Sequence, residues 1–189
     1  DLMYTNIYTE PTVEPATVAD IKTQLRVDFS DDDTLIANYL KAARVHAVNL
    51  SRTVPISTVF DTWLDCWPGD GVIVLPRRPV SAVTSITYYT LQNAATVLDA
   101  ASYVTMLSAA EPKIAPAYGY SWPTDLRARD AILVRYTAGQ GAAEANVDKR
   151  LRDLIVGLVC VWYEARDGMS AEQRNKLHFI EWALRQDGY

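Results

Sequence analysis

Asp61 and Asp65 are the two acidic residues whose spacing would suit acid–base chemistry. On a β-strand, residues four apart point to the same face, and glycosidases use pairs of carboxylic acids. The residues between them favour a plainer role, because Phe60, Thr62 and Leu64 alternate with the acids and would face a core. We therefore expect both aspartates on a solvated face, and an enzyme built on them is only a third hypothesis.

The other residue types that could carry catalysis or bind a metal lack the necessary neighbours. Both histidines, His46 and His178, lie in segments with helical periodicity, without a nucleophile motif beside them. Residues 139–141 read Gly-Gln-Gly, which is too little for a phosphate-binding loop. Cys66, in an expected strand, and Cys160 are isolated, so we expect small buried side chains in a reducing compartment. The sequence predicts no catalytic residue, no metal site and no cofactor.

Aromatic residues suggest a different kind of site in the middle of the chain. Trp63, Trp67, Tyr120 and Trp122 could form a platform on which a carbohydrate or a peptide stacks. Packing in a core or at a sheet edge is the other explanation, and we favour it. A binding module with an aromatic β lobe is therefore the alternative function.

Composition and charge argue against several classes of protein. The chain has 189 residues, of which 49% are hydrophobic and 22% charged, and its formal net charge is −5. These values are typical of a soluble globular protein, and no segment is basic enough to indicate sequence-specific DNA binding. The longest apolar run, residues 154–163, is roughly half of what spans a bilayer, and no secretion signal opens the chain. We expect no membrane association.

Helical periodicity occurs near the N-terminus. Thr17, with Asp20 three residues later, forms a capping-box pattern at the start of a helix that runs to about residue 27. Apolar residues at helical spacing predict a second helix over 33–52. Three aspartates, residues 31–33, lie at its N-terminus. They would stabilise the positive end of the helix dipole, and we favour this role over a divalent-cation site.

Helical periodicity returns near the C-terminus. A helix that is apolar almost all round is expected up to residue 166, with Gly168 beyond its end. Ser170 would cap the last helix, whose inner stripe is aliphatic, whereas Phe179 and Trp182 point well away from that stripe. The stripe consists of Leu177, Ile180 and Leu184.

Between the helical segments the hydrophobic period changes to two. Pro76 and Pro79 would bend the chain between two strands, because proline has no backbone donor. Six strands are expected, over residues 59–66, 71–75, 80–90, 103–107, 113–117 and 131–137. Strands of this length and spacing predict an antiparallel sheet folded on itself, as a small sandwich or an open barrel.

The predicted fold is therefore α+β. Residues 17–57 and 138–189 would form a helical bundle, and residues 58–137 an inserted antiparallel β lobe. Residues 1–16 have little periodicity and are expected to be an extended N-terminal arm, and residues 118–130 to be a loop.

Three stretches of the sequence are distinctive. The first is Leu-Pro-Arg-Arg-Pro-Val at residues 75–80, which leads into Ile-Thr-Tyr-Tyr at 86–89. The second is Val-Arg-Tyr-Thr-Ala-Gly at 134–139, and the third is Trp-Tyr-Glu-Ala-Arg at 162–166. In this order, the chain resembles the head-tail connector (adaptor) proteins of tailed bacteriophages over roughly residues 17–187.

The resemblance implies a structural virion protein that forms a ring, expected to contain twelve subunits, between the portal and the stopper or tail. The ring would assemble in the host cytoplasm, lie in the neck of the virion and extend the channel through which double-stranded DNA passes. In this family the C-terminal segment is expected to engage the portal. We therefore predict that Phe179, Trp182 and Tyr189 anchor that contact, as buried aromatic residues do in many interfaces.

Arg77 and Arg78 are the remaining interface candidates. In a ring, one patch of each subunit meets a different patch of the next subunit. The two arginines could contact acidic residues of such a neighbour or face water, and we favour water.

Overall fold

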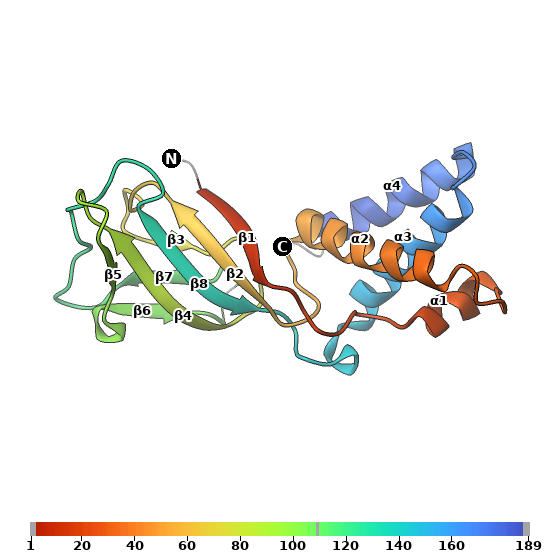
Figure 1. Ribbon diagram of the computed structural model, residues 1–189, viewed down its shortest axis with the longest axis horizontal. Helices are drawn as coiled ribbons and strands as arrows, with labels where there is room; N and C mark the ends of the chain where they lie inside the picture. The colour runs from red at the N-terminus through yellow and green to blue at the C-terminus, as the bar shows by residue number, and fades with distance from the viewer. Residues whose placement is uncertain (1–2, 109, 187–189) are drawn as a thin grey trace. The chain divides into compact units, whose positions relative to one another are not determined.

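The computed structural model describes residues 3–108 and 110–186, which divide into two units. The β lobe comprises residues 3–10 and 57–139, and the helical unit comprises residues 11–56 and 140–186. Figure 1 colours the chain by residue number and shows that each unit combines segments far apart in the sequence. The fold is α+β, as the sequence predicted.

Two antiparallel sheets form the β lobe. The first has five strands in the order β1-β2-β8-β4-β5, and the second has three in the order β3-β7-β6. The strands are β1 (Met3–Thr9), β2 (Thr58–Leu64), β3 (Ile73–Val74), β4 (Val80–Tyr89), β5 (Ala95–Val97), β6 (Tyr103–Met106), β7 (Lys113–Pro116) and β8 (Ile132–Ala138). Of these, β1 and β5 have no counterpart among the predicted strands.

Alternating side chains of the central strands fill the core of this lobe. β8 pairs with β2 on one side and with β4 on the other, and its residues Ile132, Val134 and Tyr136 are buried. Each lies directly opposite a buried β2 residue, namely Leu64, Thr62 and Phe60 respectively. These three β2 residues face the core, as their alternation predicted.

Within the segment expected to be an extended arm, residues 3–9 form the edge strand β1. This strand pairs antiparallel with β2 and has a bulge at Tyr8. Thr5 Oγ1 lies 2.7 Å from Thr62 Oγ1, and the guanidinium carbon of Arg135 lies 3.3 Å from the centroid of the Tyr8 ring. Side chains of β2 and β8 therefore hold β1 on the sheet of its own chain.

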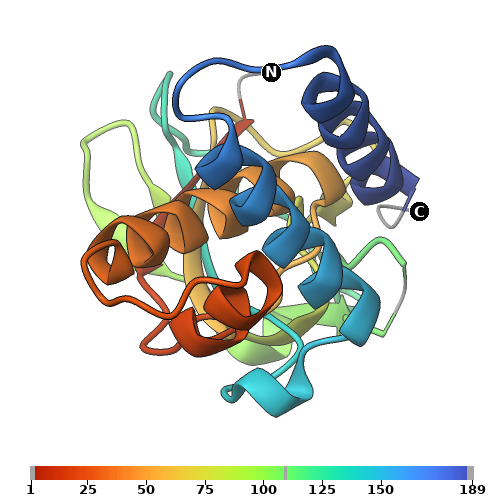
Figure 2. The same cartoon turned by 90° about the vertical axis from the view of Figure 1, so that its right-hand side faces the viewer.

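Four helices form the other unit, and Figure 2 shows them in a view turned by 90° from Figure 1. They are α1 (Val18–Leu25), α2 (Asp33–Ser51), α3 (Lys149–Glu164) and α4 (Ala171–Gln186), and a 3₁₀ turn (Glu144–Asn146) precedes α3. Their apolar stripes meet in one core, whose members include Ile21, Ile36, Leu40, Ile155, Leu158 and Leu184. Burial of each large aliphatic side chain contributes roughly 1.5–3 kcal/mol relative to exposure.

Two capping boxes define helix starts that the sequence predicted. At α1, the backbone N–H of Asp20 donates to Thr17 Oγ1, and the N–H of Thr17 donates to the Asp20 carboxylate, both at 3.1 Å. At α4, the N–H of Gln173 donates to Ser170 Oγ at 3.2 Å, and the N–H of Ser170 donates to Gln173 Oε1 at 2.8 Å. Each box satisfies two backbone donors that a helix start leaves without a partner.

Candidate protein-interaction surface

The two aspartates singled out by their spacing are bound by different arginines. Asp61 is buried, and its carboxylate oxygens accept hydrogen bonds from Nε and Nη2 of Arg135, each at 2.7 Å. Asp65 accepts hydrogen bonds from Arg129 Nη1 and from the backbone N–H of Asp130, both at 2.9 Å. The prediction of a solvated face is therefore wrong for Asp61, because its neighbour on β8 supplies a charged partner. The two carboxylates are held in separate ion pairs, not as an opposed acid and base.

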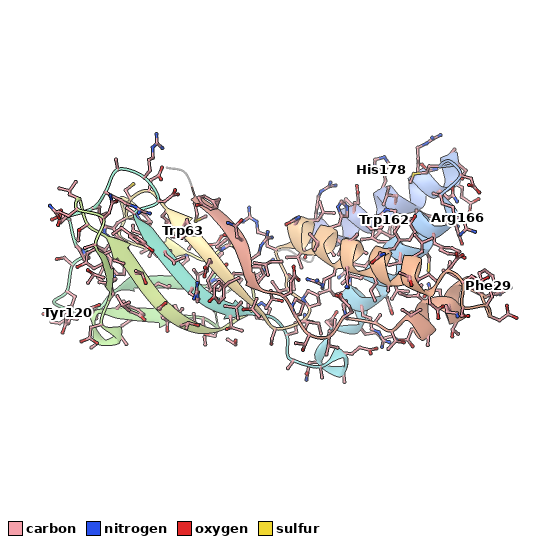
Figure 3. The ribbon with its side chains drawn as sticks, in the orientation of Figure 1. Phe29, Trp63, Tyr120, Trp162, Arg166 and His178 are labelled. Carbon is pink, nitrogen blue, oxygen red and sulfur yellow. The ribbon has the colours of Figure 1, made fainter. Side chains whose placement is uncertain are left out.

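Aromatic side chains of the β lobe stack on one another. The rings of Trp67 and Trp122 lie face to face, with centroids 4.4 Å apart and planes 7° apart. Trp63, labelled in Figure 3, stacks on Tyr89 at 5.9 Å. Each of these indoles therefore has a face covered by a ring of its own lobe, whereas Tyr120 is exposed. The packing role that the sequence favoured accounts for the three tryptophans better than a platform for a ligand.

The loop of residues 118–130 is attached to its own lobe at several points. Trp122 Nε1 donates to the Gly71 carbonyl at 2.8 Å, and Trp67 Nε1 donates to the Pro123 carbonyl at 2.7 Å. The N–H of Arg127 donates to a carbonyl of β4 at 3.0 Å. These bonds fix the course of the loop across the end of the lobe.

The Trp-Tyr-Glu-Ala-Arg stretch at the end of α3 binds the beginning of α2. The Tyr163 hydroxyl donates a short hydrogen bond to the Asp32 carboxylate, and Arg166 Nη1 lies 3.0 Å from the same oxygen. The bond from Tyr163, and next the bond from Arg166, lower the pKa of Asp32, and the bond to Asp32 raises the pKa of Tyr163. Trp162 packs edge-on against Tyr39 of α2, with ring centroids 6.4 Å apart. This stretch therefore connects two helices.

Two aromatic side chains lie exposed on α4. The exposed fraction is 64% for Phe179 and 55% for Trp182, and their ring centroids are 6.2 Å apart. Ile180 and Leu184, on the other side of the helix, belong to the buried core. The prediction that Phe179 and Trp182 point away from the inner stripe is confirmed, and their role in an interface stays a prediction. Tyr189 lies outside the described residues.

A groove beside Phe179 extends this surface. It has a volume of about 380 Å³ and lies between α3, α4 and Gln24 of α1. Gly157 lines the groove where α3 and α4 approach closely, because a Cβ there would lie 3.1 Å from Ile180 Cδ1. Cys160 also lines the groove, and burial raises the pKa of its thiol to about 11. We call the two aromatic rings together with this groove the α4 face.

Arg77 and Arg78 are half-buried in the β lobe. Arg78 Nη1 donates to the Ala110 carbonyl at 3.0 Å, so this guanidinium binds its own lobe and does not simply face water. Arg77 lies near Tyr136. Burial raises the pKa of Tyr136 to about 12, and the hydrogen bond from Thr62 and the charge of Arg77 offset part of that rise.

The histidines and cysteines do not gather into a site. Cys66 follows the end of β2 and is exposed, so the prediction of a buried strand residue is wrong. His46 Nε2 lies 3.0 Å from Glu181 Oε1, a contact between α2 and α4. Within residues 3–108 and 110–186, no cluster of three or more acidic, histidine or cysteine side chains could hold a metal ion. In the same residues, no helix is both long and apolar enough to cross a bilayer.

Two features of the β lobe were missed from the sequence. The pairing of β1 with β2 joins residues that are at least fifty positions apart, and nothing local in the sequence indicates it. The contact of Arg135 with both Asp61 and Tyr8 depends on that pairing. A usable signal existed nonetheless, because Met3–Thr9 contains no charged residue, proline or glycine and is rich in tyrosine and threonine.

Comparison with known proteins identifies a family that this chain matches. Residues 15–117, more than half of the chain, match the model of the phage gp6-like head-tail connector proteins. No curated protein matches the chain.

Solved structures share the fold over nearly the full length. A chain from the neck of an empty gene transfer agent (GTA) particle, computed with C6 symmetry, matches with a TM-score of 0.80 and 23% identity, covering 96% of this chain and 95% of that one. A chain from the virion of a native GTA particle has a TM-score of 0.77 and 25% identity, covering 94% and 93%. A chain from the neck of a native GTA particle, computed with C12 symmetry, has a TM-score of 0.78 and 23% identity, covering 96% and 94%. The present chain therefore belongs to the phage gp6-like head-tail connector protein family.

Proposed function

We propose that this protein forms a ring between the portal and the stopper or tail, and that double-stranded DNA passes through that ring. Family membership supports the position at the head-tail joint. The similar neck structures were computed with C6 or C12 symmetry, which supports a ring, and we propose twelve subunits. The observation that carries the proposal is a head-tail connector family match on a chain whose last described helix exposes two large aromatic side chains.

The α4 face is the proposed contact with the portal. Phe179 and Trp182 lie about one helical turn apart, so both can enter one apolar site on a partner. Aromatic residues at the centre of an interface often supply a large part of the binding free energy. The groove beside Phe179 offers a place for an apolar side chain of the portal.

The charge of the chain suits a channel that DNA must leave as well as enter. A formal net charge of −5 gives little attraction for phosphates, and tight binding of DNA requires many lysine or arginine contacts. We therefore propose that DNA passes without sequence-specific binding. The separate ion pairs of Asp61 and Asp65 support the further expectation that the protein has no enzymatic activity.

Electron microscopy of the full chain mixed with its portal tests this proposal. We expect a ring of twelve subunits attached to the portal, coaxial with the DNA channel. A portal that stays bare at saturating concentrations of the chain would contradict the proposed position. A bound ring of a different number would contradict only the stoichiometry.

A further inference from the structure

The described part of the β lobe has four edge strands, which differ in length. β1 and β5 are the edges of the five-stranded sheet, and β3 and β6 are the edges of the three-stranded sheet. β3 has two residues and β5 has three, whereas β6 has four and β1 has seven. Very short edge strands offer few backbone groups to another chain. β1 and β6 are therefore the two edges that could pair with an added strand.

Neither of these two edges is protected by a charged residue or a proline of its own. Natural sheets commonly place charged residues or prolines on their edges, and neither Met3–Thr9 nor Tyr103–Met106 contains one. Both strands also expose large apolar side chains, including Met3 and Tyr8 on β1 and Val104 and Met106 on β6. The bulge at Tyr8 leaves residues 3–7 as a regular stretch. That stretch is long enough to pair with all of β6.

The two edges lie on different sides of the lobe. β1 and β5 are at opposite ends of the five-stranded sheet. Residues 98–102, which include a 3₁₀ turn (Ala100–Ser102), connect β5 directly to β6. Because such a short connection keeps its two strands close, β6 lies on the β5 side of the lobe, away from β1. Figure 1 shows this separation.

We infer that β1 of one copy pairs, as an added strand, with β6 of the next copy. Pairing by strand addition satisfies backbone donors and acceptors along both edges and covers the exposed apolar side chains. Because the two edges are different and lie apart, each copy can use one for each neighbour. Such a head-to-tail contact repeats, and it forms a ring when the rotation between neighbouring copies closes, whereas pairing of β1 with β1 would stop at a dimer. The inference rests on the proposed ring, whose contacts it specifies.

Disulfide crosslinking of the full chain tests this pairing. The two exposed positions Asn6 on β1 and Thr105 on β6 are changed together to cysteine (N6C and T105C). Cys66 is exposed and is replaced by serine, whereas Cys160 can stay because burial keeps its thiol protonated. Under mild oxidation we expect a ladder of linked copies beyond the dimer. The matched control combines T105C with T84C, since Thr84 is exposed on the internal strand β4.

Thiols held in contact should react at least about tenfold faster than those of the control, because pairing raises their effective concentration. A rate equal to that of the control would overturn the inference. So would dimers formed by N6C alone, since they would indicate pairing of β1 with β1. Thermal unfolding of each variant checks that these surface substitutions leave the fold intact.

The same samples separate this inference from the proposed function. A ring seen on the portal without linkage between positions 6 and 105 contradicts the strand pairing and leaves the proposed function standing. Linkage between positions 6 and 105 above the control, without a ring on the portal, supports the strand pairing and contradicts the proposed position at the portal. A lysine at Ile7 or Val104 should weaken self-association at least about tenfold, because a charge on an edge strand opposes pairing, whereas T84K should not.

Discussion

Asp61 is buried in the β lobe, where Arg135 donates a hydrogen bond to each of its two carboxylate oxygens. Hydrogen bonds to Asp61 raise the pKa of Arg135, so this guanidinium stays charged. The Tyr8 ring covers the guanidinium from β1. One ion pair and one ring thus join β1, β2 and β8. Asp61, whose spacing from Asp65 would suit catalysis, therefore makes a structural contact.

Replacing Asp61 with asparagine should lower the free energy of unfolding by about 1–3 kcal/mol, since Arg135 loses its charged partner in a largely buried position. Urea unfolding at neutral pH measures the loss. The control is E172Q, which removes the exposed pair of Glu172 with Lys176 and should cost less than about 0.5 kcal/mol. Equal effects of the two changes would contradict a structural role for the Asp61 pair.

Asp32 should make stability depend on pH in acid. Its hydrogen bonds with Tyr163 and Arg166 lower its pKa below the ordinary 3.8, so the unfolded chain binds a proton more readily than the folded one. The contribution of Asp32 is therefore complete above the unfolded pKa and is lost as the pH falls through the folded pKa. Urea unfolding from about pH 5 downward should show a shallower loss for D32N than for the natural chain. The neighbouring exposed acid supplies the control D31N, and an unchanged slope in D32N would count against this account.

At the scale of elements, strands with buried residues could be predicted from the sequence, whereas two of the exposed strands could not. β4 was predicted over residues 80–90 and spans Val80–Tyr89, because β-branched and aromatic residues concentrate there after two prolines. β1 and β5 were missed, since almost every residue in them is exposed and no alternation of buried and exposed positions can develop. Cys66 was misplaced for a related reason: local pattern does not tell where pairing with β8 stops, and the ladder ends at Leu64.

The candidate surface could be predicted in part for the same physical reason. The 3.6-residue period separates Phe179 and Trp182 from the buried stripe of α4, so their exposure follows from the sequence alone. The groove beside Phe179 does not follow from the sequence, because it forms where three helices meet. The partner that would bind this surface is another protein, so the sequence of this chain does not identify it.

A prediction about binding to the portal concerns helix α4. Changing Phe179 and Trp182 together to alanine should weaken affinity for the portal at least about 100-fold, because each aromatic anchor is typically worth about 2 kcal/mol. Phe29 is an exposed aromatic residue in the loop between α1 and α2, and F29A is the matched control. Equilibrium binding of each variant to the portal measures the difference. Unchanged affinity of the double variant, with its helical content intact, would exclude the α4 face as the anchor.

The contact between α3 and α4 carries a prediction about stability. A Cβ at Gly157 would lie 3.1 Å from Ile180 Cδ1, the flexible end of that side chain. In G157A the better helix propensity of alanine, about 1 kcal/mol, should roughly offset this crowding. G157V should lower the free energy of unfolding by about 1–3 kcal/mol through overpacking. Adding I180V to G157V should restore part of the loss, which a double-mutant cycle from urea unfolding would measure. If the two losses of unfolding free energy were fully additive, contact with Ile180 would not be the cause of the destabilisation.

At the scale of the whole molecule, the chain contributes to each unit twice. It begins in the β lobe, forms α1 and α2, returns to the lobe for β2 to β8, and ends with α3 and α4. Neither unit is a continuous stretch of sequence. A fragment that contains residues 58–137 alone would lack β1, and residues 17–57 alone would lack the helices that bury their apolar stripe.

This order of segments has a consequence during synthesis on the ribosome. β1 is made well before β2 and β8, whose side chains hold it on the sheet. At ~5–20 residues per second, β1 waits on the order of ten seconds before Arg135 has been made. The aromatic pair on α4 is translated after all the strands of the β lobe and after the other three described helices. A nascent chain therefore cannot engage a partner through α4 until nearly all of both units has emerged, so translation itself delays assembly until the subunit can be complete.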